Sequence, residues 1–129
     1  QKTAAEAQTL LDNNNGLTLV IAANYGGQWD IVQAARQAAQ AALNGDIKPE
    51  DITIDSFSNY LSLANEPMVD LLIRSSGELR ISNFLLWDVA YSEFYFTDTL
   101  WPDFDETELN KAIVSFNHRD RRFGARKEK

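Results

Sequence analysis

The sequence contains no cysteine and a single histidine, His118. A disulfide framework, a thiolate metal site and thiol redox chemistry are therefore excluded, and His118 has no cysteine or second histidine with which to hold a metal ion. The lack of cysteine fits a reducing compartment such as the cytoplasm. No arrangement of serine, histidine and acid for nucleophilic catalysis is apparent either.

Long hydrophobic runs are also missing. The longest clean apolar run, residues 17–23, is far shorter than the roughly 20 residues that cross a bilayer. The first residues lack the pattern of a signal peptide. The sequence therefore predicts a soluble chain, and a peripheral contact with the inner face of a membrane remains open.

Basic residues are scarce over most of the chain. Residues 1–118 hold six Lys or Arg against seventeen Asp or Glu, whereas residues 119–129 hold six basic and two acidic side chains. The net charge of −7 argues against a nucleic-acid partner, because counterion release from phosphates requires a basic face. The basic C-terminal segment is either a solvated end or an anion contact.

What is present is the composition of an ordinary globular domain, with 44% hydrophobic and 24% charged residues among 129. Three segments predict strands, namely residues 17–24, 69–73 and 93–96. Helices are predicted over residues 1–12, 28–43, 55–61 and 104–122. The alternation of strand, turn and helix indicates the α/β class, a parallel sheet flanked by helices.

Local signals refine the predicted helices. Asp55 is a candidate N-cap of the third helix, and Asp105 with Glu108 has capping-box spacing at the start of the last. The face of the second helix that we expect to pack on the sheet consists of Val32, Ala35, Ala39 and Ala42. Gly45 is expected to end that helix.

Two of the scarce basic residues, Arg74 and Arg80, flank a Ser-Ser-Gly turn directly after a predicted strand. Open α/β sheets bind ligands at the carboxyl ends of their parallel strands. Guanidinium groups grip phosphate bidentately, so this pair could clasp one anion, with Ser82 and the amides of a helix-like segment at residues 82–87 as further donors. The alternative is that both arginines form structural ion pairs with Glu78 and other acids.

Glu93 opens the strand at residues 93–96 and could direct its carboxylate toward the same rim as Arg74. Carboxylates are ligands that suit Mg²⁺, although an ordinary surface acid is the alternative. Gly26 and Gly27 sit between a predicted strand and helix as in a phosphate loop. They lack the spacing of nucleotide-binding fingerprints, so simple turn geometry is the favoured interpretation.

Large aromatic side chains are dense between residues 87 and 104. We expect most of them in the core. An excess beyond what a small domain can bury would mark a subunit interface.

Three segments carry a resemblance to a known family: "RSSGELRISNFLLWDVAYSEFYFTDTLWPDF" at residues 74–104, "VIAANYGG" at 20–27 and "RRFG" at 121–124. Over nearly all of residues 1–124 the chain resembles the cis-prenyltransferases, in particular the bacterial undecaprenyl diphosphate synthases. The resemblance implies a homodimeric, Mg²⁺-dependent enzyme that condenses isopentenyl diphosphate with an allylic diphosphate. Its product would be a long-chain cis-polyprenyl diphosphate, the lipid carrier of cell-wall glycan assembly.

The resemblance also implies roles for individual residues. The positions that match residues gripping the diphosphate of isopentenyl diphosphate are Arg74, Arg80 and Ser82. Glu93 matches a glutamate that helps to hold Mg²⁺. Arg122 and Gly124 match an Arg-x-Gly ending that contacts a diphosphate in the neighbouring subunit's site.

The chain departs from the family pattern in lacking an N-terminal Asp-Gly-Asn-Gly-Arg-Trp segment, which carries the family's catalytic aspartate and its allylic phosphate loop. Most of the tunnel that sets product length is missing as well. We therefore expect residues 1–129 to be the C-terminal portion of one cis-prenyltransferase domain, without a catalytic residue and inactive alone, the allylic diphosphate binding to the other half. The alternative is a non-catalytic dimerisation and diphosphate-binding module, similar to the accessory subunits of heteromeric relatives.

Overall fold

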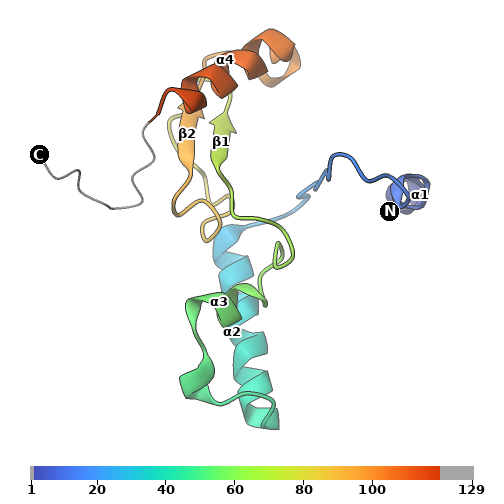
Figure 1. The fold of residues 1–129 in the computed structure, drawn as a ribbon, viewed down its shortest axis with the longest axis vertical. Helices are drawn as coiled ribbons and strands as arrows, with labels where there is room; N and C mark the ends of the chain where they lie inside the picture. Colours follow the sequence, from blue (N-terminus) through green and yellow to red (C-terminus); the bar gives the residue numbers. More distant parts are fainter. Residues whose placement is uncertain (1, 120–129) are drawn as a thin grey trace, which may run out of the picture.

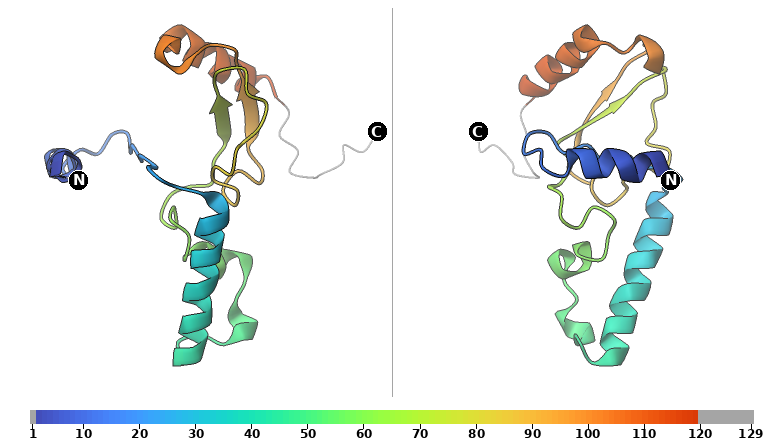
Figure 2. Two further views of the ribbon diagram at one scale, coloured as in Figure 1. Left: turned by 180° about the vertical axis from the view of Figure 1, so that it is seen from behind. Right: turned by 90° about the vertical axis from the view of Figure 1, so that its right-hand side faces the viewer.

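The computed structural model describes residues 2–119. The helices are α1 (Lys2–Leu11), α2 (Gly27–Asn44), α3 (Ile54–Ser58) and α4 (Glu106–Asn117). The strands are β1 (Leu71–Arg74) and β2 (Glu93–Phe96), and single 3-10 turns occur at Pro49–Asp51 (η1) and Trp101–Asp103 (η2). Figure 1 and the left view of Figure 2 show α2 with α3 at one end, the strands with α4 at the other, and α1 apart from both.

The two strands form a parallel sheet, as predicted. Leu71 lies opposite Glu93 and Arg74 opposite Phe96. The ladder is extended at both ends, because the Glu93 amide donates to the Asp70 carbonyl and the Thr97 amide to the Arg74 carbonyl. With α4 in contact with β2, the α/β class is confirmed, although the described part of the sheet has two strands and not three.

The prediction of a strand at residues 17–24 is wrong for the described structure. This segment runs as an extended connection between α1 and α2 (Figure 1), without regular secondary structure. A strand needs a neighbour for its backbone amides and carbonyls, and nothing within residues 2–119 pairs with it. Leu17 and Ile21 are consequently 93% and 80% exposed.

Helix α2 forms almost where predicted but buries a different face. Its buried residues follow an i, i+4 spacing: Asp30, Ala34 and Ala38, with Gly27 at the first turn. Val32, on the predicted packing face, is 48% exposed. The reason is that α2 packs against α3 and not on the sheet, and the packing partner decides which stripe is covered. Gly45 ends α2 in the left-handed conformation, as expected.

The helix caps agree with the sequence at α4 but not at α3. The Asp105 carboxylate accepts from the Glu108 amide at 3.0 Å. At α3 the N-cap is Thr53 and not Asp55, because Thr53 and Ser56 exchange side-chain and backbone hydrogen bonds. Helix α4 ends at Asn117, and residues 120–122 of the predicted helix lie outside the described residues.

The core of the described chain is small. Its buried hydrophobic residues are Ala34, Ala38, Leu61, Leu72, Val89 and Ala112. The aromatic residues of 87–104 are half-buried or exposed, Tyr91 by 69% and Trp101 by 72%, so the expectation that most lie in the core is wrong. None of the helices within residues 2–119 has the length and apolarity to cross a bilayer.

Candidate functional site

A pocket of about 430 Å³ opens at the carboxyl end of β1. Its polar side is formed by Arg74, the last residue of the strand, with Ser75 and Ser76. Its apolar side is formed by Leu72, Ile73, Ile81, Phe84 and Trp101. The pocket thus combines a guanidinium and two hydroxyls with a hydrophobic wall, at the sheet edge where such folds bind ligands.

Arg74 enters this pocket with an unused donor. Its Nε is buried and finds no hydrogen-bond partner among residues 2–119. A buried donor without an acceptor costs about 1–3 kcal/mol, and nearly all such groups in folded proteins are paired. An oxyanion bound at Arg74 would remove that cost.

The turn after Arg74 is held by the loop that follows β2. The Ser76 amide donates to the Thr99 carbonyl and the Gly77 amide to the Thr97 carbonyl, both at 2.9 Å. Ser76 and Gly77 both adopt positive φ, 70° and 69°. The two backbone bonds therefore fix a strained turn, and with it the shape of the pocket.

Arg80 does not join Arg74 in this pocket. Its guanidinium forms an ion pair with the Glu78 carboxylate, and its side chain is 69% exposed. Arg80 therefore forms the structural ion pair with Glu78 that was the alternative to anion binding. Arg74 instead keeps a guanidinium donor free, as anion binding requires.

The segment that carries Ser82 is a docked loop, so the predicted helix start at residues 82–87 is wrong. Ser82, Asn83 and Leu85 all have positive φ, at 47°, 63° and 46°. The loop instead covers the N-terminus of α2: the Asn83 carbonyl accepts from the Gly27 amide at 2.7 Å, and its Oδ1 accepts from the Gln28 amide at 2.8 Å. These bonds satisfy donors that every helix leaves open at its first turn.

The glycine pair before α2 serves this docking. A Cβ on Gly26 would lie 2.9 Å from the Asn83 side-chain nitrogen, and one on Gly27 would lie 2.8 Å from Leu86 Cγ. Any larger residue would push the loop away. The pair therefore permits a close approach of two chain segments, which supports the interpretation as backbone geometry over a phosphate loop.

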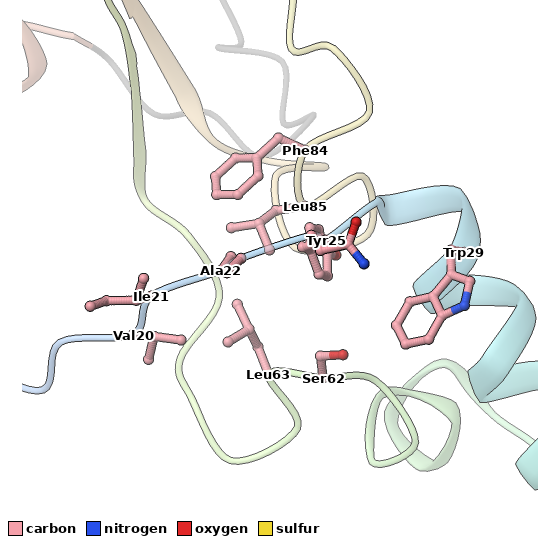
Figure 3. Close-up of a pocket in the computed structure, with 11 residues that line it drawn as sticks. Val20, Ile21, Ala22, Tyr25, Trp29, Ser62, Leu63, Phe84 and Leu85 are labelled. Carbon is pink, nitrogen blue, oxygen red and sulfur yellow. The ribbon is translucent and has the colours of Figure 1, made fainter. Parts of the chain in front are cut away.

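A second, apolar pocket of about 320 Å³ lies beside the docked loop (Figure 3). Its lining includes Val20, Ile21, Tyr25, Leu63, Phe84 and Leu85. Figure 3 shows Phe84 and Leu85 on one side of it and Leu63 and Ser62 on the other. Phe84 lines both this pocket and the Arg74 pocket, so the two are neighbours with a common wall.

The described chain has two buried carboxylates, Asp30 and Asp88. Asp30 is fully paired: it accepts from the Tyr25 hydroxyl at 2.9 Å and from the Ser62 amide and hydroxyl at 3.1 and 2.8 Å. Asp88, 7% exposed, has a buried Oδ2 without a partner among the described residues. Burial raises the pKa of the Asp88 carboxyl; a hydrogen bond from its own backbone amide lowers it in part, and the negative charge of Asp30 adds a smaller rise. Burial, followed by Asp30, raises the pKa of the Tyr25 phenol.

Glu93 is not on the rim that Arg74 occupies. It begins β2 opposite Leu71, three residues before the register position of Arg74, so it lies at the other end of the sheet. Its Oε2 accepts from the Arg119 guanidinium at 2.8 Å. No group of three potential metal ligands forms within residues 2–119. Glu93 could therefore supply one carboxylate ligand to a cation, after its hydrogen bond with Arg119 breaks. The other ligands of such a site are not found among the described residues. Arg122 and Gly124 lie outside the described residues.

An arginine pocket at the carboxyl end of a parallel strand places this chain in the class of α/β folds that bind ligands at that edge of the sheet. Comparison with known proteins narrows this class. Residues 1–124 match the sequence model of the family described as "Putative undecaprenyl diphosphate synthase". The chain belongs to this family, the cis-prenyltransferases.

Individual relatives support the same family assignment. The chain is 53% identical over 124 residues to a ditrans,polycis-undecaprenyl-diphosphate synthase of Haemophilus influenzae, covering 96% of this chain and 52% of the relative. It is 56% identical over 115 residues to the synthase of the same name from Photorhabdus laumondii, covering 89% and 45%. Among solved structures, lavandulyl diphosphate synthase from Lavandula x intermedia, crystallised with dimethylallyl diphosphate, superposes with a TM-score of 0.92 at 41% identity, covering 96% of this chain and 53% of that one. The chain spans about half the length of the curated relatives it matches.

Sequence reasoning missed three residues of this site: Asn83, Phe84 and Trp101. Asn83 and Phe84 directly follow Ser82 in the longest segment that resembles the family, and this position could have marked them as candidate site residues. Their contacts with α2 and with both pockets depend on long-range packing, which residue spacing does not encode.

Proposed function

We propose that this chain provides the isopentenyl diphosphate clamp of a cis-prenyltransferase that makes a long-chain, undecaprenyl-type diphosphate for the cell-wall lipid carrier. The observation that carries the proposal is Arg74, with its unpaired buried Nε in a pocket that also offers Ser75 and Ser76. Membership of the family supports the choice of a diphosphate ester over other anions.

The geometry suits a diphosphate attached to a short alkyl group. The diphosphate would lie against Arg74 and the serines, because guanidinium groups bind phosphate oxygens through charge-assisted hydrogen bonds. Arg80 and Ser82 would complete the clamp once Arg80 releases Glu78. Holding the ester in this way positions its double bond for attack on an allylic partner, which is the main contribution of such a site to the rate.

Mg²⁺ is the proposed cofactor. Glu93 is the residue of this chain that would hold it, with other ligands drawn from outside the described residues and from substrate phosphates. The bound ion would offset the negative charge of a diphosphate. The Arg119 guanidinium, which donates to Glu93 Oε2 at 2.8 Å, would hold that carboxylate in position until the ion binds.

The proposed assembly is a homodimer in the cytoplasm, in peripheral contact with the membrane that receives the lipid product. Arg122 and Gly124 would contribute to the partner's diphosphate site. The exposed aromatic side chains of Tyr91 and Trp101 suit burial in an interface. Sedimentation velocity of the chain tests the dimer, and co-sedimentation with vesicles of anionic and neutral lipids tests the membrane contact.

The experiment that tests the clamp is titration calorimetry of isopentenyl diphosphate into the chain. Replacing Arg74 by glutamine should weaken binding by about 2–4 kcal/mol, the cost of removing one partner of a buried charged pair. Arg36→Gln, on the exposed face of α2, makes the same change of charge away from the pocket and should bind like the parent chain. Equal affinities of the Arg74 and Arg36 variants would refute the clamp.

A non-catalytic dimerisation and diphosphate-binding module is the second candidate, since the Arg74 pocket could bind a diphosphate without a reaction following. Incorporation of labelled isopentenyl diphosphate into an allylic primer, measured with the aspartate-bearing half of a relative supplied, separates the two, because only the clamp predicts incorporation there. We expect no incorporation by these 129 residues alone, because they contain no match to the family's catalytic aspartate segment. Measurable incorporation by the isolated chain would contradict that expectation.

A further inference from the structure

Phe84 stands where the two pockets meet. It lines the Arg74 pocket together with Ile81 and Trp101, and it lines the apolar pocket together with Tyr25 and Leu85. It is the one residue shared by the two pocket linings, within the part of the chain that the structure describes. The side chain is 42% exposed, so much of the ring faces open space rather than a packed core.

The ring is held in position from two directions. Its edge meets the Tyr25 ring, with centroids 5.9 Å apart and an interplanar angle of 82°, a favoured aromatic arrangement. Its backbone belongs to the docked loop, between Asn83, which is bonded to α2, and Leu85, which has positive φ. Phe84 therefore cannot move far from its place between the two pockets unless the loop separates from α2.

This position has a consequence for an alkyl diphosphate bound at Arg74. With the diphosphate on the polar side of the pocket, the alkyl group would lie along Leu72, Ile81 and Phe84. A five-carbon group would need only this wall. A longer chain would have to continue past Phe84, toward the apolar pocket lined by Val20 and Ile21.

We propose that Phe84 is the residue that limits the alkyl length of the diphosphate ester accepted beside Arg74, by closing the Arg74 pocket against the apolar pocket. The inference rests on the proposed function, since it takes the ligand of the Arg74 pocket to be an alkyl diphosphate. It adds a specificity role to a residue whose side chain has no hydrogen-bonding group and no charge.

The test compares three ligands by calorimetry on the full chain: inorganic pyrophosphate, isopentenyl diphosphate with five carbons, and geranyl diphosphate with ten. In Phe84→Ala the boundary is removed and the pockets merge. The affinity for the ten-carbon ester relative to the five-carbon ester should rise by at least about tenfold, the scale on which pocket shape discriminates alkyl groups. Pyrophosphate affinity should stay within about twofold, a change of only about 0.4 kcal/mol.

Two further variants keep the result interpretable. Phe84→Trp retains an aromatic wall and should keep or sharpen the preference for five carbons. Phe57→Ala removes a phenyl ring that contacts Trp87 at a tilt of 45° and lines neither pocket, so it reports the general effect of losing an aromatic contact. Its ligand ratio should equal that of the parent chain.

The outcomes separate the inference from the proposed function. If the parent chain binds pyrophosphate and isopentenyl diphosphate but the ratio is the same in Phe84→Ala, the inference is wrong and the clamp stands. An equal loss of all three ligands in Phe84→Ala also overturns it, because Phe84 then acts only by supporting the loop. If the parent chain binds none of the ligands, the clamp itself is refuted and the inference with it.

Discussion

Asn83 closes the N-terminus of α2 from 55 positions further along the chain, its Oδ1 accepting from the Gln28 amide at 2.8 Å. Its own carbonyl accepts from the neighbouring Gly27 amide at 2.7 Å. This one residue thus ties the loop that carries Arg80, Ser82 and Phe84 to the longest helix of the described chain. The relative positions of the two pockets depend on this attachment.

Asn83→Ala should destabilise the chain by about 1–2 kcal/mol, because it removes the side-chain acceptor of an amide in the first turn of α2 and places alanine at a φ of 63°. The same variant should weaken pyrophosphate binding, since the docked loop supports the Arg74 pocket. Thermal unfolding and calorimetry measure the two effects. Asn83→Asp keeps both the acceptor and the tolerance of positive φ, so it should retain most of the stability. Identical losses in the two variants would show that the cap contributes nothing.

Gly27→Ala should cost about 1–3 kcal/mol, the usual penalty for forcing extra atoms into a packed contact. The added Cβ would lie 2.8 Å from Leu86 Cγ and 2.9 Å from its backbone nitrogen. Gly16→Ala is the matched control, because nothing lies within 4 Å of its Cβ position. Urea unfolding of both variants measures the difference. Equal midpoints would mean that the loop does not dock on α2.

Asp88→Asn should make the chain more stable at neutral pH, by about 0.5–2 kcal/mol, the range of single stabilising substitutions. The pKa of the Asp88 carboxyl is raised in the folded chain, first by burial and then by the charge of Asp30. Its contribution to stability is therefore fully present below the ordinary pKa of 3.8 and is lost as pH rises through the raised value. The advantage of the asparagine variant should appear over that interval and level off above it.

Thermal melts of the parent chain and of Asp88→Asn between pH 3 and pH 8 measure this dependence. Asp12→Asn, at an exposed position, makes the same substitution and should follow the parent chain throughout. A stability difference that does not change with pH would assign the effect of Asp88→Asn to packing and not to charge.

Glu78→Gln should strengthen pyrophosphate binding by up to about fivefold, since an ion pair whose arginine side chain is 69% exposed is worth roughly 0–1 kcal/mol and its loss frees Arg80 for the ligand. The gain should shrink at high salt, where the ion pair is already screened. Calorimetry at two salt concentrations provides the test. Weaker binding in the variant would mean that Glu78 orients Arg80 for the ligand and does not compete with it.

The sequence by itself determined the local elements. Helices α2 and α4, both strands and the caps at Asp105 and Gly45 follow from hydrophobic spacing and from side chains that satisfy backbone groups only a few residues away. The family resemblance likewise rested on contiguous residues and was confirmed by the match over residues 1–124. Arg74 as the anion-binding candidate followed from its place directly after a strand.

Only the tertiary structure decided which faces and side chains meet. Residues 17–24 have the composition of a buried strand but no neighbour to pair with in the described chain, and α2 turned Ala34 and Ala38 inward because α3 is its partner. The register placed Glu93 at the far end of the sheet from Arg74. Asn83 and Phe84 became the cap and the common wall through contacts across long stretches of sequence. Such contacts form only when the whole chain packs, because the energy of each depends on the position of its partner and not on the residues beside it.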